Sequence, residues 1–160
     1  MAKVLIMRHG EAAPGHPDHT RRLTARGKQE VTRMARWLAE RVANGELPMP
    51  RFYASPYVRA QQTAQLLCDE LEASLETLEI ITPDDAPCGV SDWLMSEPEN
   101  VPLMLVSHMP LVGELAGLLV EGSAAQGLGF PTAAIAELEA DVWAAGCARL
   151  TGFTQPSQVG

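Results

Sequence analysis

The sequence has few cysteines, few basic residues and no long apolar run, and each shortage excludes a class of protein. Its three cysteines, Cys68, Cys88 and Cys147, are widely spaced and form no Cys-x-x-Cys pair. This pattern argues against a disulfide framework or a zinc site, so we expect reduced thiols, two of them in the core. Twelve Lys and Arg residues against 20 Asp and Glu residues give a net charge of −8. Such a charge disfavours broad nucleic-acid or anionic-membrane binding.

The missing apolar runs also bear on localisation. No stretch approaches the roughly 20 apolar residues of a membrane span, and Arg8 interrupts the N-terminal apolar run too early for a signal peptide. We therefore expect a cytoplasmic protein. The 160 residues are 46% hydrophobic, with a mean hydropathy of −0.02, which predicts a single globular domain over 1–160. The tail at 155–160 is expected to be disordered.

Apolar and turn-forming residues predict alternating strands and helices. Buried strands are expected at 3–7, 52–54 and 103–106, an edge strand at 78–81, and a late antiparallel pair at 133–139 and 148–153. Helices are expected from a Thr24 cap to about 44, from Ser55-Pro56 to about 71, over 92–96, and from Pro110 through 119. This alternation predicts an α/β three-layer sandwich, with a mainly parallel central sheet and helices on both faces.

Polar side chains follow three of these strands at the point where each strand ends. Arg8-His9-Gly10 follows the first, Ser55-Pro56 follows the second with Arg59 one turn further, and Ser107-His108 follows the strand at 103–106. Because parallel strands end at one edge of a sheet, these groups should converge there with helix N-termini, which attract anions. Gly10 is expected to allow a sharp turn and room for a ligand. The sequence therefore predicts a phosphoryl-binding site with a histidine able to act as nucleophile or proton carrier.

These segments resemble the motifs of the histidine phosphatase superfamily, also called the phosphoglycerate mutase-like family. The matching runs are Arg8-His9-Gly10-Glu11, Ser55-Pro56-x-x-Arg59-Ala60-x-x-Thr63-Ala64 and Ser107-His108-x-Pro110. The resemblance covers nearly the whole chain and is closer to the bacterial phosphohistidine phosphatases, through Arg21-x-Leu23-Thr24 among other runs. The lid insertions of larger family members are absent from the spacing between the motifs.

The resemblance implies a role for each polar residue. His9 attacks phosphorus in line and forms a covalent phosphohistidine intermediate, which water hydrolyses. Arg8 and Arg59 hold the phosphoryl oxygens and help keep His9 neutral. His108, protonated when phosphate is present, binds the same oxygens, and Arg21 reaches the phosphate from its loop. The family implies no cofactor, and a metal site is disfavoured because the arginines repel a cation.

Each of these residues also has an ordinary structural explanation. A histidine at a strand end can simply be satisfied by hydrogen bonds, and surface arginines can form salt bridges. The three motifs together make the functional interpretation the stronger one. His16 and His19 lie in a polar loop and are expected to be exposed rather than catalytic.

A general acid is missing from the family pattern. Asp84, Asp85 and Asp92 lie in the region where it would fall, but none is in a recognisable motif. A phosphohistidine substrate offers a reason, since its P–N bond releases an imidazole, which is protonated near pH 6.5 and needs less acid help than an alkoxide. By resemblance, the partner is the histidine phosphotransfer domain of a hybrid sensor kinase. The protein would then down-regulate a two-component phosphorelay.

Two alternatives stay open. A small-molecule phosphomonoester phosphatase of the same superfamily would be favoured by an acid among Asp84, Asp85 and Asp92 pointing at the phosphate. A non-catalytic phosphate- or phosphohistidine-binding module would keep its affinity when His9 is replaced by alanine.

Overall fold

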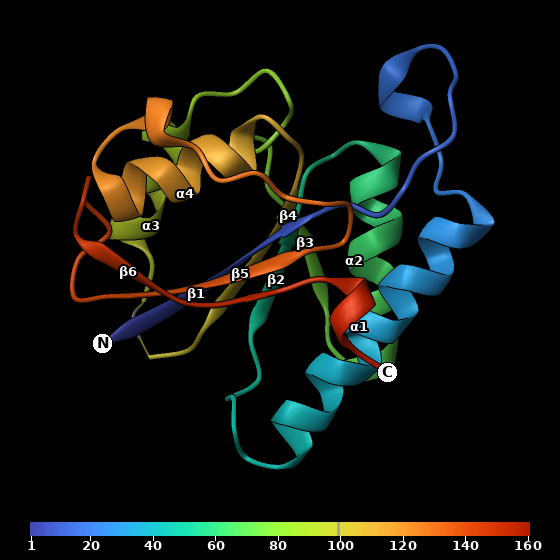
Figure 1. Cartoon of the computed structure of the whole chain (residues 1–160), viewed down its shortest axis with the longest axis horizontal. Helices are drawn as coiled ribbons and strands as arrows, with labels where there is room; N and C mark the ends of the chain where they lie inside the picture. Colours follow the sequence, from blue (N-terminus) through green and yellow to red (C-terminus); the bar gives the residue numbers. More distant parts are fainter. Residues whose placement is uncertain (99) are drawn as a thin grey trace.

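The central element is a single six-stranded sheet, seen in a computed structural model that describes residues 1–98 and 100–160 (Figure 1). Its strands are β1 Ala2–Arg8, β2 Arg51–Ala54, β3 Leu75–Thr77, β4 Leu103–Ser107, β5 Ile135–Ala140 and β6 Ala148–Thr154. Their order is β3-β2-β4-β1-β5-β6. The first four strands are parallel, whereas β5 is antiparallel to β1 and β6 to β5. The predicted mainly parallel sheet with a late antiparallel pair is confirmed.

Helices cover both faces of this sheet. Helices α1 Ala25–Ala43 and α2 Val58–Leu71 pack on one face, and α3 Pro87–Ser96 and α4 Leu111–Glu121 on the other (Figure 1). No helix in the described part of the chain is long and apolar enough to cross a membrane. The three-layer α/β architecture predicted from the sequence is therefore the one observed.

The apolar run of β1 reads as a strand buried from both sides. Val4 and Ile6 belong to the core under α3 and α4, whereas Leu5 and Met7 belong to the core under α1 and α2. Successive side chains of a strand point to opposite faces, so a central strand needs apolar residues at every position. This burial fixes the direction and the end point of β1, and with them the position of Arg8.

Helix α1 begins where the sequence predicts. The Thr24 hydroxyl accepts a hydrogen bond from Gly27 N at 2.9 Å and caps the helix. The helix lies very close to the loop after β1. A Cβ added at Gly27 would lie 2.2 Å from the Glu11 carbonyl oxygen, and one added at Gly10 would lie 2.7 Å from Val31 Cγ2. Gly10 has no left-handed φ, and the close approach of Val31 explains the glycine, because a larger side chain would collide with α1.

Three element boundaries differ from the prediction. The edge strand β3 lies at Leu75–Thr77 instead of 78–81, because the ladder pairs these residues with β2, and Ile81 packs into the core from a loop. Helix α2 begins at Val58, since Ser55 does not cap it. Helix α3 begins at Pro87 instead of 92, with the proline in its first turn.

The C-terminal tail is ordered, contrary to the prediction. Pro156–Gln158 forms a short 3₁₀ helix closed by a capping box between Gln155 and Gln158. Pro156 is buried and Val159 packs against the core under α1, which gives the tail an apolar anchor.

The cysteine prediction is also partly wrong. Cys68 on α2 is buried, whereas Cys88 and Cys147 are exposed, so one thiol instead of two lies in the core.

Candidate active site

The polar segments after β1, β2 and β4 meet at one edge of the sheet. His9 N donates to Ser107 O at 2.9 Å, which joins the ends of β1 and β4. The rings of His9 and His108 have centroids 5.0 Å apart. The guanidinium of Arg59, the second residue of α2, lies with Nε 3.2 Å from His9 Nε2. The structure therefore brings residues from three separate motifs into direct contact.

Hydrogen bonds define the tautomer of His9. Its Nδ1 lies 2.7 Å from Gly10 O. Because a carbonyl oxygen can only accept, Nδ1 must carry the proton. Nε2 is then unprotonated and accepts the hydrogen bond from Arg59 Nε. The free lone pair of a neutral imidazole thus faces the arginine.

The surroundings of His9 keep the ring neutral. Burial lowers the pKa of His9 to about 4, the hydrogen bond to Gly10 opposes this shift, and the charges of Arg59 and Arg8 lower the pKa further. The direction agrees with the sequence argument. The main cause is different, because loss of solvation outweighs the arginine charges.

His108 is held by Ser55, which directly follows β2. His108 Nε2 lies 2.7 Å from Ser55 Oγ, and the ring packs edge-on against Tyr57. Burial, followed by the nearby His9 and Arg59, lowers the pKa of His108 to about 3. A phosphate dianion would act in the opposite direction, because a nearby negative charge favours the imidazolium. His108 Nδ1 is buried and has no hydrogen-bond partner among the described residues.

Arg8 is anchored by a distant carbonyl. Its Nη1 donates to Phe130 O at 2.8 Å, and its backbone N donates to Ala134 O. Burial lowers the pKa of Arg8. Its Nε is the second buried side-chain nitrogen without a partner in the described part of the chain. A buried donor without a partner is costly, so Arg8 Nε, which can only donate, is suited to an added acceptor such as an oxyanion.

One carboxylate binds two of the predicted arginines. Arg59 donates through Nη1 to Asp18 O at 2.9 Å and through Nη2 to Asp18 Oδ2 at 3.2 Å, and Arg21 Nη1 lies 3.1 Å from Asp18 Oδ1. The hydrogen bond from Arg21 is the main cause that lowers the pKa of Asp18. Arg21 is thus the member of the Arg21-Arg22 pair that reaches this cluster. Two guanidinium groups therefore hold one carboxylate, each through a different oxygen.

Thr63 of α2 links the histidine loop to this arginine. Its Oγ1 accepts from Gly10 N at 3.1 Å and donates to Arg59 O at 2.8 Å. Thr63 is fully buried, so this link fixes the spacing between His9 and Arg59.

In the described part of the chain, the remaining candidates make no hydrogen bond to His9, His108 or Arg59, although the His19 ring lies edge-on to Tyr57, which packs against His108. Asp85 accepts hydrogen bonds from Thr82 N and Oγ1 at 2.8 Å each, and Asp84 and Asp92 are exposed. His16 and His19 are exposed, as expected. No group of three or more His, Cys, Asp or Glu residues able to hold a metal ion occurs within 1–98 and 100–160.

Sequence reasoning missed four contributors to the site. Asp18 could have been found from the sequence, since Asp-x-x-Arg places it three residues before Arg21, the spacing of an ion pair within a short helical turn. Ser55 and Thr63 stood inside the matched motif without an assigned role. Phe130 contributes only its backbone carbonyl, which no side-chain pattern could reveal.

Comparison with known proteins assigns the class. The model of the histidine phosphatase superfamily (branch 1) matches residues 4–82. The phosphohistidine phosphatase SixA homolog of Haemophilus influenzae is 37% identical over 124 residues, which cover 72% of this chain and 76% of that protein. The chain belongs to the histidine phosphatase superfamily, and it is a phosphatase.

Within the superfamily, the chain is similar to the SixA proteins. Phosphohistidine phosphatase SixA of Escherichia coli is 35% identical over 148 residues, 87% of this chain and 86% of that protein. A solved structure of the protein histidine phosphatase SixA complexed with tungstate superposes with a TM-score of 0.84 at 33% identity, covering 98% of both chains. The resemblance inferred from the motifs is confirmed.

Proposed function

We propose that the protein is a protein phosphohistidine phosphatase and that His9 carries the phosphoryl group as a covalent intermediate. The observation that carries the proposal is the fixed tautomer of His9. Gly10 O holds the proton on Nδ1, and burial keeps the ring neutral, so that Nε2 presents its lone pair. A nucleophilic histidine needs both conditions.

The reaction has two displacements. His9 Nε2 attacks phosphorus, the P–N bond to the substrate imidazole breaks, and the imidazole leaves with the bonding electron pair and takes up a proton. Water then attacks phosphorus, the bond to His9 Nε2 breaks, and inorganic phosphate is released. Arg59 Nε, which now donates to His9 Nε2, turns to a phosphoryl oxygen when substrate enters.

Four cationic or neutral donors stabilise the transferred group. Arg8, Arg21, Arg59 and His108 supply hydrogen bonds to its oxygens, and positive charge opposes the negative charge of the transition state. Arg59 contributes a side chain only 5% exposed, where the surrounding protein strengthens its electrostatic effect. No cofactor or metal takes part in this scheme.

The positions of the three candidate general acids favour a phosphohistidine substrate. Asp85 is bound to Thr82, and Asp84 and Asp92 are exposed, so among the described residues none of the three is held at His9 by a hydrogen bond. The imidazole leaving group needs little acid help. The names of the two SixA relatives give phosphohistidine as the group that they dephosphorylate.

The mouth of the site suits a substrate attached to a protein. Only 55–57 separate β2 from α2, and only 108–110 separate β4 from α4, so no lid is inserted at these two strand ends. We assign the partner as the histidine phosphotransfer domain of a hybrid sensor kinase. Removal of its phosphoryl group down-regulates a two-component phosphorelay.

Phosphate release from a radiolabelled histidine phosphotransfer domain tests the proposal. Wild type and the control His16→Ala, which changes an exposed histidine of the neighbouring loop, should release phosphate rapidly. His9→Ala should release none, and acid-free quenching of wild type should trap label on His9. Release by His9→Ala would remove His9 as the nucleophile.

The same experiment separates the alternatives. Faster turnover of p-nitrophenyl phosphate than of the phosphorylated domain would indicate a small-molecule phosphomonoesterase. Tight binding of the phosphorylated domain by wild type without any release would indicate a binding module.

A further inference from the structure

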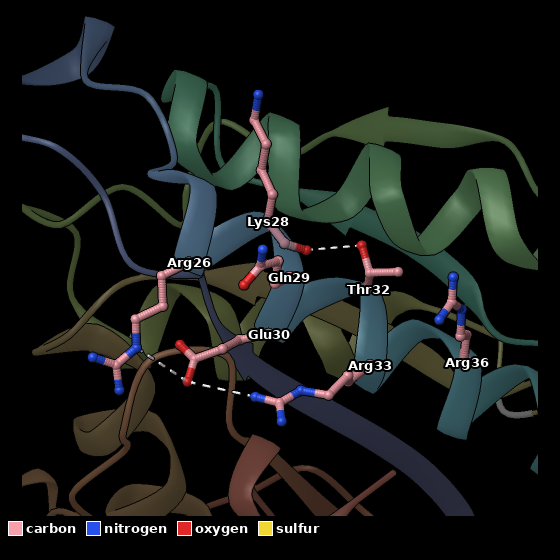
Figure 2. A pocket seen from close by; sticks show the side chains of 7 residues that line it. All are labelled: Arg26, Lys28, Gln29, Glu30, Thr32, Arg33 and Arg36. Atoms are coloured by element: carbon pink, nitrogen blue, oxygen red, sulfur yellow. Dashed lines mark hydrogen bonds and ion pairs between the residues drawn. The ribbon is translucent and has the colours of Figure 1, made fainter.

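Helix α1 has an exposed basic face that the proposed chemistry does not use. Figure 2 shows an open hollow along this helix, lined by Arg26, Lys28, Gln29, Glu30, Thr32, Arg33 and Arg36. The cations Arg26, Lys28, Arg33 and Arg36 are all exposed. The helix buries Val31, Met34 and Leu38 against the sheet instead.

The charge of this face is opposite to that of the molecule. Helix α1 contains five of the twelve Lys and Arg residues and two of the twenty Asp and Glu residues. One helix of net charge +3 therefore lies in a chain of net charge −8. Clustered charge of one sign attracts a partner surface of the other sign.

The arginines of the α1 basic face, which we define as Arg26, Arg33 and Arg36, are only weakly neutralised by the protein itself. A single carboxylate oxygen, Glu30 Oε2, lies 3.8 Å from Arg26 Nε and 3.9 Å from Arg33 Nη2 (Figure 2). No ion pair to Arg36 is found among the described residues. Long, exposed pairs of this kind contribute little to stability.

Arg41 on the same helix is an arginine with a structural role. It makes a bidentate pair with the buried Glu137, at 2.7 Å and 3.0 Å, and its guanidinium packs over the Trp37 ring. The arginines of the α1 basic face have none of these contacts. Their charge is available to another molecule.

The α1 basic face starts at the rim of the site. Thr24, the cap of α1, donates to the Glu11 carboxylate at 2.8 Å and to Glu11 O through its backbone N at 3.0 Å. Glu11 lies two residues after His9. From Arg26 to Arg36 the helix advances about 15 Å away from this point.

We propose that the α1 basic face docks an acidic surface of the protein that presents its phosphohistidine to His9. The inference rests on the proposed function and names a second contact with the same substrate. A protein seated over the site lies within reach of the first turns of α1, and an acidic surface complements the arginines. Charges at the rim of an interface act mainly on the association rate and on its salt dependence.

The test reverses two charges two turns or more from the site. Arg33→Glu/Arg36→Glu should lower kcat/KM for the phosphorylated domain about tenfold at low salt, leave kcat unchanged, and flatten the salt dependence of kcat/KM. Phosphoramidate, a small P–N compound, should be hydrolysed at the wild-type rate. The control Arg51→Glu/Arg149→Glu changes two exposed arginines and the net charge by the same amount. It should behave like wild type.

Equal kcat/KM values for the two double variants would overturn the inference while leaving the proposed function standing. Absence of phosphate release by wild type would instead overturn the proposed function. If wild type bound phosphatidylglycerol vesicles or duplex DNA through these arginines, with the kinetics unaltered, the occupant would not be the substrate protein. Arg33→Gln/Arg36→Gln supplies a milder variant whose smaller loss of kcat/KM must follow the same salt dependence.

Discussion

The protonation of His9 gives the sharpest quantitative test of the site. With a pKa of about 4, lowered mainly by burial, the ring stays neutral as the pH falls until about pH 4. At pH 5, about nine-tenths of the molecules would hold a neutral His9, against about 3% for a histidine with the ordinary pKa near 6.5. Between pH 7 and pH 5 the neutral fraction would fall by only about a tenth, compared with roughly 25-fold for the ordinary ring.

NMR of protein labelled with ¹³C at histidine Cε1 measures this fraction directly. The His9 signal, assigned by its loss in His9→Ala, should shift by only about a tenth of its full titration change between pH 8 and pH 5, and its midpoint should lie near pH 4. It should also show the Nδ1-H tautomer, in keeping with the hydrogen bond to Gly10 O. In 6 M guanidinium chloride, the same histidine should titrate near 6.5. A His9 midpoint above 6 in the folded protein would refute the reasoning from burial.

Further predictions concern Arg59, Asp18, the packing at Gly27 and the absence of a metal from the reaction. Arg59→Ala should reduce turnover of the phosphorylated domain by roughly 10²–10³-fold with an unchanged circular dichroism spectrum; full activity would place Arg59 outside the site. Asp18→Asn should tighten phosphate binding in calorimetry by at most about tenfold, because Asp18 is 56% exposed and exposed ion pairs are weak; weaker binding would show that Asp18 positions the arginines. Gly27→Ala should lower the free energy of unfolding in urea by about 1–3 kcal/mol, because its Cβ would lie 2.2 Å from Glu11 O, whereas Gly89→Ala meets nothing within 4 Å and should not be destabilising. EDTA should leave turnover unchanged, and activity restored by added zinc after chelation would contradict a metal-free reaction.

The parts of the fold set by local patterns could be predicted from the sequence. The apolar run of β1 and the Thr24 cap each act within a few residues, and both lie where expected. The three-residue strand β3 could not be located, because its pairing with β2 decides its position and the more apolar residues around Ile81 pack from a loop. The tail could not be predicted for the same reason, since Val159 packs against a core built from distant parts of the chain.

The site also has a part that could be predicted from the sequence and a part that could not. His9, His108 and Arg59 could be located from the sequence, because each histidine directly follows a strand and Arg59 lies in the first turn of α2. Arg8 is the last residue of β1, and Arg21 lies in the loop before α1. The network that orients them could not, because its bonds join distant parts of the chain. Arg8 binds a carbonyl 122 residues away, and His108 binds Ser55, 53 residues away. Such partners are visible only once the sheet has brought them together.

His9 and His108 directly follow β1 and β4, the two central strands of the sheet, and this placement has a consequence for local unfolding. Edge strands β3 and β6 have a neighbour on one side only, whereas β1 and β4 are paired on both sides. Amide hydrogens of central strands generally exchange only through the larger openings of a protein. Fraying at either edge should therefore leave His9 and His108 in register with each other, and the catalytic geometry should persist until the sheet itself opens.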